Sequence, residues 1–317
     1  MDNLCHSLAG AALAECGFAK RSRFATAAMV IAANIPDVDV AYIFFGDQLS
    51  GLESRRGWTH SVPALALWPF VVVGGVLLWR RFSVRRPPAN APPLKLTMLL
   101  IGCAIAVLSH PFLDWMNEYG VRVLMPWSDR WFYGDTLFIV DLVLLLLFGG
   151  GWWLARLRRR RDRPRAALLA RTAVALALLY MVAMKVQSER SRTVVEAALG
   201  RGPLNRRQLM IGPLPLTMRT RRALIVTDSG YVLRNVHAGL RVSLGDVTEF
   251  LPTNAAHPLS RAAMATDEYR RFRRWSRFPY FVPGAAGDST VFVGDARYAR
   301  GTSTTWAGTL IRLSRSP

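Results

Sequence analysis

The sequence predicts a mainly α-helical protein, a multi-pass transmembrane bundle followed by a small C-terminal α+β domain. About the first 185 residues are strongly apolar, and several runs are long enough to cross a bilayer. Beyond residue 190 the segments become short, β-branched and separated by Gly or Asp turns, which is typical of strands. We therefore expect a membrane-embedded helical domain over residues 1–187 and a soluble α+β domain over 188–317.

Breaks in the apolar pattern divide the N-terminal domain into its elements. Residues 4–19 predict a short helix that ends at Gly17 and a basic cluster, and 24–45 are apolar but interrupted at Asn34–Asp39. Because Pro36 and the polar groups around it cannot continue a helix inside hydrocarbon, we expect that helix to end there. Residues 46–60 form a polar loop. The expected membrane spans are 61–79, 94–109, 136–155 and 166–184.

The C-terminal domain shows strand and helix signals in turn. Residues 222–227, 231–236 and 290–294 predict strands, and 260–275 predict one basic helix. The basic and aromatic stretch 269–280 has two interpretations: contact with anionic lipid head groups or nucleic acid, or a solvated helix face with an apolar stripe. The second is favoured.

Positive charge predicts how the bundle is oriented. The chain has 41 Lys and Arg against 21 Asp and Glu, a net charge of +20. Nucleic-acid binding is one interpretation and predicts strongly salt-dependent binding to DNA. A membrane protein with basic cytoplasmic loops is favoured, because much of the charge follows apolar runs directly. Loops 20–23, 80–95 and 156–165 should then be cytoplasmic, in a bacterial inner membrane, with the C-terminal domain on the outer side.

The same orientation gathers titratable residues at the outer ends of the helices. His110 and Asp114 are four residues apart, so on a helix they share one face. Polar groups at the end of an apolar helix are costly unless a partner satisfies them, and a divalent metal does so. The candidate ligands are Asp2, His6, Asp37, Asp39, His60, His110 and Asp114.

A metal bound there would activate water for hydrolysis. Neutral imidazole and carboxylate suit zinc, with manganese as the alternative, and an open position admits water. We expect Asp37 or Asp39 to join His60, His110 and Asp114 around one ion, and Asp2 and His6 to lie near a second. His60, His110, Asp114 and Asn117 are the candidate catalytic residues. Asn117 either orients His110 or binds substrate, and a helix C-cap is the structural alternative.

Two other classes of function compete with a hydrolase. One is a non-enzymatic membrane protein whose closed metal site holds helix ends together while the C-terminal domain binds a partner. The other is a transporter, which would place polar groups at several depths instead of on one side. A serine hydrolase is disfavoured by the absence of a G-x-S-x-G elbow around residues 56–61.

Several motifs together resemble the membrane-bound, metal-dependent hydrolase family of the YdjM type, in particular its longer members with an added C-terminal domain. They are Met1–Gly10, Ile35–Asp39, Arg56–Ser61, Ser109–Asp114, Asn117–Gly120, Tyr133–Asp141 and, in the C-terminal domain, Arg271–Phe281 and Val291–Tyr298. The family often carries a histidine before the Arg-Gly-x-Thr-His run, and Arg55 stands there in this chain. The ligand order is also similar to that of zinc-dependent phospholipase C, although the further histidines of its zinc cluster are not evident after Asp114.

The expected class of substrate follows from the predicted location of the site at the membrane surface. A site beside lipid head groups favours a lipid or lipid-linked phosphoester as substrate and membrane lipids as partners, while nucleic acid is disfavoured. The sequence carries no signal for oligomeric state.

Overall fold

The computed structural model describes residues 1–83, 91–200, 202–205, 207–285, 287–299, 301–302 and 306–313. The chain forms two compact units. The first comprises Met1–Asp39 and Arg56–Lys185, and the second comprises Val40–Arg55 and Val186–Pro317. The division falls at residues 185/186, two residues before the predicted boundary at 187/188. It also assigns the segment Val40–Arg55 to the C-terminal unit. Arg85, Arg86 and residues 87–90 of the predicted basic linker lie outside the described residues.

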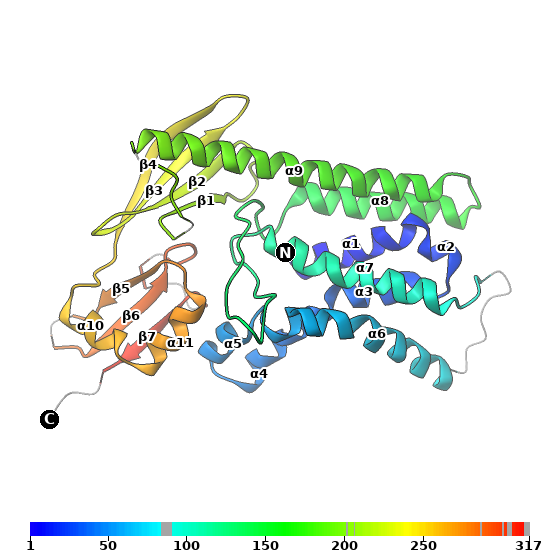
Figure 1. The fold of residues 1–317 in the computed structure, drawn as a ribbon, viewed down its shortest axis with the longest axis horizontal. Helices are drawn as coiled ribbons and strands as arrows, with labels where there is room; N and C mark the ends of the chain where they lie inside the picture. Colours follow the sequence, from blue (N-terminus) through cyan, green and yellow to red (C-terminus); the bar gives the residue numbers. More distant parts are fainter. Residues whose placement is uncertain are drawn as a thin grey trace. The chain divides into compact units, whose positions relative to one another are not determined.

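The first unit is built from helices (Figure 1). They are α1 (Asn3–Leu13), α2 (Ala19–Arg21), α3 (Ala25–Asn34), α6 (Val62–Phe82), α7 (Leu96–Trp115), α8 (Leu142–Arg160) and the first part of α9 (Ala166–Ala198), joined by a π-helical segment Ala14–Phe18 and 3-10 helices at Ile35–Ala41 and Trp58–His60. The predicted end of the first helix at Gly17 coincides with the π-helical segment. The predicted break after Asn34 is also present: α3 ends there, and the 3-10 helix that follows begins at Ile35 and contains Pro36.

Within the described part of the chain, three helices are long and apolar enough to cross a membrane: α6, α7 and α9. They correspond to three of the four predicted spans. The fourth, predicted at 136–155, is α8, which begins at Leu142 and continues to Arg160. Its last turns carry Arg156 and Arg158–Arg160. The uncharged part of α8 is therefore too short for the helix to count as a candidate membrane span.

Close helix packing places the polar ends of the first unit together. Helix α1 packs against α3 and α8, and α7 packs against α3 and α6. Small residues permit this approach: a Cβ at Gly10 would lie 2.6 Å from the carbonyl oxygen of Met29 on α3. Buried alanines continue the interface on α3, where Ala28 and Ala32 lie in the same core as Val107 of α7. Residues 6, 37 and 110 are therefore brought to one region from three different helices.

The second unit combines two antiparallel sheets with short helices. Its elements are α4 (Tyr42–Phe45), α5 (Gln48–Ser54), β1 (Leu209–Pro213), β2 (Thr220–Val226), β3 (Gly230–Ala238), β4 (Val242–Pro252), α10 (Pro258–Met264), α11 (Asp267–Trp275), β5 (Pro279–Pro283), β6 (Thr290–Asp295) and β7 (Gly308–Arg312). One sheet has the order β1-β2-β3-β4 and the other β5-β6-β7. The predicted strands are β2, β3 and β6. The predicted helix 260–275 is two helices, because Thr266 caps α11 by accepting a hydrogen bond from the N–H of Tyr269.

Ion pairs attach the segment Val40–Arg55 to the C-terminal unit. The guanidinium of Arg271 on α11 donates to both carboxylate oxygens of Asp47 at 2.9 and 3.0 Å and to Glu53 at 2.9 Å. The side chain of Gln48 donates to the carbonyl oxygen of Gly308. On its other face α11 buries Phe272. Phe272 and Trp275 form the apolar stripe of the favoured interpretation, a solvated helix face with such a stripe. The basic face is not simply solvated, because Arg271 is engaged in ion pairs.

Candidate metal centre

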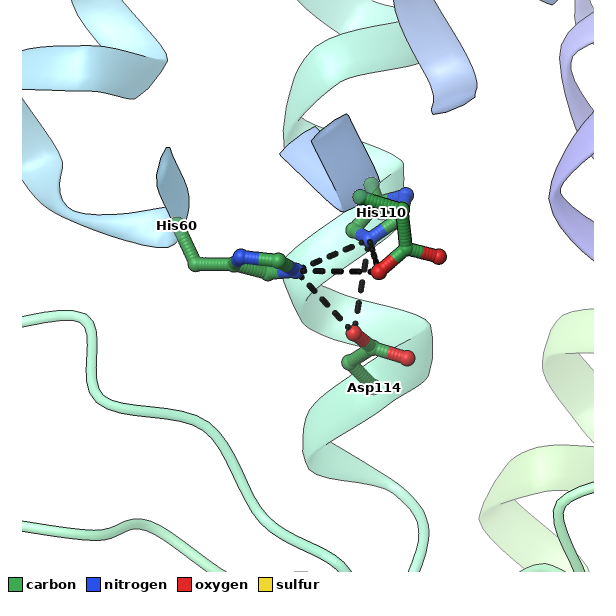
Figure 2. A group of neighbouring side chains, drawn as sticks. His60, His110 and Asp114 are labelled. Carbon is green, nitrogen blue, oxygen red and sulfur yellow. Dashed lines mark hydrogen bonds and ion pairs between the residues drawn. The ribbon is translucent and has the colours of Figure 1, made fainter. Parts of the chain in front are cut away.

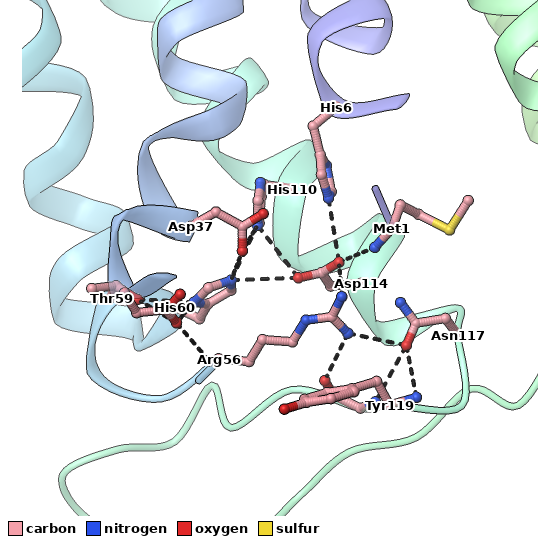
Figure 3. A network of polar contacts seen from close by, with 12 residues as sticks. Met1, His6, Asp37, Arg56, Thr59, His60, His110, Asp114, Asn117 and Tyr119 are labelled. Atoms are coloured by element: carbon pink, nitrogen blue, oxygen red, sulfur yellow. Dashed lines mark hydrogen bonds and ion pairs between the residues drawn. The ribbon is translucent and has the colours of Figure 1, made fainter. Parts of the chain in front are cut away.

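Four buried side chains meet at one point of the first unit. His110 and Asp114 lie one turn apart on α7, and His60 ends the 3-10 helix Trp58–His60 (Figure 2). Asp37 lies in the 3-10 helix Ile35–Ala41 (Figure 3). One nitrogen or carboxylate oxygen from each lies within 4.8 Å of the others. The four side chains are at most 4% exposed. The spacing of four residues between His110 and Asp114 thus places both on one face, as predicted.

The distances among these four atoms are short. The Nε2 atoms of His60 and His110 are 3.1 Å apart, and Asp114 Oδ2 lies 3.4 and 3.3 Å from them. Asp37 Oδ1 lies 3.7 Å from both nitrogens. No hydrogen bond of normal geometry reaches Asp114 Oδ2 from any residue that the structure describes. Four electron-rich atoms therefore surround one small space.

Hydrogen bonds at the far side of each ring fix which nitrogen faces that space. His110 Nδ1 lies 2.6 Å from the carbonyl oxygen of Ala33, which only accepts, so Nδ1 carries the proton. His60 Nδ1 lies 3.0 Å from Thr59 Oγ1, and that hydroxyl donates to Asp39 Oδ2 at 3.2 Å. In the neutral rings both Nε2 atoms then present lone pairs to the centre. This is how a protein orients histidine ligands for a metal.

A cation at the centre would resolve the repulsion among these acceptors. A proton on one imidazole can serve one neighbouring acceptor well, whereas a divalent ion is attracted to all four at once. Buried carboxylates without such a partner are strongly destabilising. The donor set of two imidazoles and two carboxylates therefore fits a divalent metal ion and could hold one.

The second oxygen of Asp114 faces nitrogen atoms, among them the Arg56 guanidinium. Asp114 Oδ1 accepts hydrogen bonds from the Met1 amino group and lies 2.9 Å from an Arg56 guanidinium nitrogen and 3.3 Å from His6 Nε2 (Figure 3). The His6 ring stacks on His110 with centroids 3.8 Å apart. Asp114 is thus shared between a face of acceptors and a face of donors.

Arg56 is a site residue to which sequence reasoning assigned no role. Its guanidinium also donates to Asn117 Oδ1 at 3.0 Å and to the carbonyl oxygen of Gly120 at 3.2 Å, and its backbone N–H donates to Asp39 Oδ2 at 2.6 Å. The backbone of Arg56 has φ +51°, which is uncommon for a residue with a side chain. The sequence feature that could have identified Arg56 as a site residue is its position at the start of the Arg-Gly-Trp-Thr-His run, which ends at His60.

The remaining predicted site residues lie around the four-atom cluster, outside it. Asp39 is buried behind His60, where it accepts from Arg56 and Thr59. Asp2 caps α1 by accepting from the N–H of Cys5, and His6 reaches Asp114 without joining the cluster. Asn117 Oδ1 accepts from the N–H groups of Tyr119 and Gly120, and so holds the turn after α7 as well as Arg56.

The cluster is deeply buried, and burial governs the charge of the groups outside the membrane-spanning segments. Burial lowers the pKa of His6 to about 3, and His110 beside it acts in the same direction. Burial also lowers the pKa of His60. For Asp37, burial alone would raise the pKa, but the His110 ring, when it is protonated, donates to the carboxylate and holds the pKa well below its ordinary value. His6 and His60 are therefore neutral, and Asp37 is ionised, at neutral pH.

The fold and the cluster define a helical membrane protein with a buried candidate metal centre. The chain belongs to the YdjM inner membrane protein family, whose model matches residues 1–189. It is also 29% identical over 104 residues to YfhP of Bacillus subtilis (strain 168), an uncharacterized protein. That similarity covers 33% of this chain and 28% of YfhP, so the chain spans less than a third of that relative's length. No solved structure matches the chain significantly.

Proposed function

We propose that the protein is a membrane-bound, metal-dependent hydrolase that acts on phosphoesters, with Asp37, His60, His110 and Asp114 as the metal ligands. The observation that carries this proposal is the division of Asp114, whose Oδ2 joins the ligand atoms while its Oδ1 contacts Arg56. A site that only held helices together would not need a buried guanidinium beside its ligands. An anionic substrate would need one, because arginine binds phosphate oxygens in a bidentate manner.

Five of the six distances among the four ligand atoms support zinc as the ion. Ligands about 2.0 to 2.1 Å from a tetrahedral zinc ion lie about 3.3 to 3.4 Å from one another. The five separations given above range from 3.1 to 3.7 Å. When bound, such an ion supplies Lewis-acid chemistry, lowering the pKa of water and polarising a phosphoryl oxygen. Manganese is the alternative, since carboxylates also suit it.

Residues behind the ligands hold them in position. Asp39 and Thr59 keep the His60 ring turned so that Nε2 faces the centre, and the carbonyl group of Ala33 does the same for His110. Stacking of His6 fixes the plane of the His110 ring. Asn117 holds the Arg56 guanidinium at 3.0 Å, where that guanidinium can orient the phosphoryl group of a substrate. These residues position the site before any substrate binds.

Location supports the substrate class and the topology. The cluster lies at the end of α7, a helix apolar enough to span a membrane, and the basic segments 20–23 and 156–165 lie at the opposite ends of α1 and α8. We infer from the positive-inside bias that those segments are cytoplasmic and that the cluster lies on the outer side. A lipid or lipid-linked phosphoester is the substrate class that reaches such a position.

One observation favours a second candidate function, a structural metal site. Four protein ligands close a tetrahedral set, and closed sites are typical of structural zinc. In that case the metal would hold α7 to the segments that carry Asp37 and His60. The protein would then be a non-enzymatic membrane protein whose C-terminal domain binds a partner.

Metal content and hydrolysis together test the proposal. Elemental analysis of the detergent-purified protein should find stoichiometric zinc or manganese, absent from a His60→Ala/His110→Ala variant. The matched control is His237→Ala/His257→Ala, which removes the two histidines of the C-terminal unit and should retain the metal. Wild type and control should hydrolyse an aryl phosphodiester or a lipid phosphomonoester, and the site variant should not.

The outcomes separate the two candidate functions. Metal that is lost in the site variant, combined with no hydrolysis in any variant across both phosphoester probes, would contradict the hydrolase and support the structural site. Absence of metal from the wild type would contradict both.

A further inference from the structure

A second polar site lies at the other end of the first unit and does not depend on the proposed hydrolase. An open cavity of about 420 Å³ is lined by the end of the π-helical segment, α2, the end of α8 and the start of α9. Helix α1 and its continuation separate it from the metal centre, because His6 and Gly17 are eleven residues apart, roughly 16 Å of helix. Figure 1 shows α2 and the α8–α9 connection at the same end of the unit.

The walls of this cavity are strongly basic. Six basic and two acidic side chains line it, a net charge of +4. The basic residues are Lys20, Arg21, Arg159, Arg163, Arg165 and Arg171. We call this cavity the basic pocket.

Among the basic residues of the pocket, Arg159 is neutralised by an ion pair with Glu15. Glu15 is 3% exposed, and its carboxylate accepts two hydrogen bonds from Arg159, at 2.7 and 2.8 Å. This pair closes the inner wall. No carboxylate that the structure describes lies within ion-pair distance of Lys20, Arg21 or Arg171. The pocket therefore holds an excess of positive charge that the protein itself does not neutralise.

Two guanidinium groups converge over Gly17. A Cβ at Gly17 would lie 3.6 Å from a terminal nitrogen of Arg171 and 4.0 Å from one of Arg21. Arg171 is held there, because its Nε donates to the carbonyl oxygen of Cys16 at 2.9 Å. Gly17 itself has φ +144°, a conformation that a larger residue would find strained. Like charges held together without an acid between them favour binding of an anion, and paired arginines suit a phosphate group.

The position of the pocket indicates which phosphate. Ala166 and Ala167 in its wall begin α9, a helix apolar enough to span a membrane, and Arg171 lies little more than one turn further along. Leu154 on α8 and Leu168 on α9 are each 53% exposed, as expected of side chains that face lipid. A ligand here would have its anionic group among arginines and its apolar part along helices that expose leucines. Basic pockets between membrane helices commonly bind anionic lipid head groups in this way.

We propose that the basic pocket is a binding site for the phosphate group of an anionic phospholipid. The residues that bind it are Arg21 and Arg171, with Lys20 and Arg163 adding charge at the rim. A soluble phosphate compound has the same anionic group but lacks an apolar part that could contact the exposed leucines of α8 and α9.

Lipid titration of the full-length protein in a neutral detergent, followed by native mass spectrometry, tests this site. The probes are phosphatidylglycerol, phosphatidylcholine, inorganic phosphate and glycerol 3-phosphate. We expect wild-type protein to retain phosphatidylglycerol in preference to the other three. In Arg21→Gln/Arg171→Gln the apparent affinity for phosphatidylglycerol should fall about thirtyfold. Each basic side chain near an anionic lipid surface contributes roughly a fivefold factor in affinity, and this variant removes two.

The matched control is Arg158→Gln/Arg160→Gln, which removes the same charge from two exposed arginines of the same basic run that do not line the pocket. Its affinity should stay within about twofold of wild type. Lys20→Gln/Arg163→Gln is a second pocket variant, with an intermediate loss expected, in case the first fails to fold. Equal losses in pocket and control variants, or no loss in either pocket variant, would overturn the proposal. Equal retention of glycerol 3-phosphate and phosphatidylglycerol would overturn the assignment to lipid.

Discussion

Asp114 and Asp295 are both fully buried carboxylates, one in each unit, but their surroundings are opposite in character. Around Asp295 every neighbour is a donor. Its Oδ1 accepts from the backbone N–H and Nε of Arg297, and its Oδ2 accepts from the hydroxyl of Ser276 and the N–H groups of Arg277 and Phe278. The charge of Asp295 is thus satisfied within the chain.

Asp114 is satisfied on one side only. Its Oδ1 contacts Arg56, but its Oδ2 faces the unprotonated nitrogens of His60 and His110 in their neutral forms. The comparison teaches that burial of an acid does not by itself indicate function. A carboxylate surrounded by donors stabilises the fold, whereas one that converges with other acceptors could be satisfied by an ion from outside the chain. This distinction carries the assignment of the metal centre.

The largest effect should come from Asp295→Asn, which leaves the Arg297 guanidinium buried without its counter-charge. We expect the C-terminal unit to lose about 3 to 5 kcal/mol of stability. Protease digestion of the full-length protein in detergent should then cut residues 207–313 much faster than in wild type, while residues 96–115 remain protected. Unchanged digestion of the C-terminal unit would mean that the network around Asp295 does not stabilise it.

Acid should weaken the same network over a defined pH range. Burial alone would raise the pKa of Asp295, but Arg297 and the donors around it hold the pKa at about 2. A carboxylate with a lowered folded-state pKa stabilises the fold above its unfolded value of about 4, and this contribution, roughly 2 kcal/mol, is lost as pH falls from 4 to 2. Pepsin digestion of the C-terminal unit should accelerate across this range. In Asp295→Asn this pH-dependent step should be smaller; a step of the same size would assign it to other acids.

A smaller effect, on metal affinity, is expected from changing Thr59, which contacts the proposed metal ligand His60. Thr59→Val removes the hydroxyl that links His60 to Asp39, so the ring loses its orientation and metal affinity should fall about tenfold. Thr59→Ser keeps the hydroxyl and should bind as wild type does. Competition with a chromogenic chelator measures both. Equal affinity in the Val and Ser variants would show that the hydroxyl does not orient the ring.

Much of the fold and part of the centre could be predicted because they depend on local pattern. Apolar runs with basic ends predict α6, α7 and α9, and a separation of four residues on a helix places His110 and Asp114 together. The choice between Asp37 and Asp39 could not be made, because two residues apart on a 3-10 helix they point in different directions. Only the structure shows Asp37 in the cluster and Asp39 behind His60.

What could not be predicted depends on contacts between distant residues. Arg56 follows another arginine in a polar loop and resembles a solvated side chain until its contact with Asp114 is seen. The attachment of Val40–Arg55 to the C-terminal unit depends on Arg271, more than two hundred residues away from Asp47 and Glu53. Local periodicity carries no information about such pairs.

The most direct test of the central claim is the metal content of two matched variants, Asp114→Asn and Asp295→Asn, purified side by side with the wild type. Each change replaces one fully buried carboxylate with an amide of the same shape. The account predicts about one divalent ion per chain in wild type and in Asp295→Asn, and a large loss of that ion in Asp114→Asn, in protein that still elutes as a folded species. Full metal content in Asp114→Asn would contradict the assignment of the cluster as a metal centre.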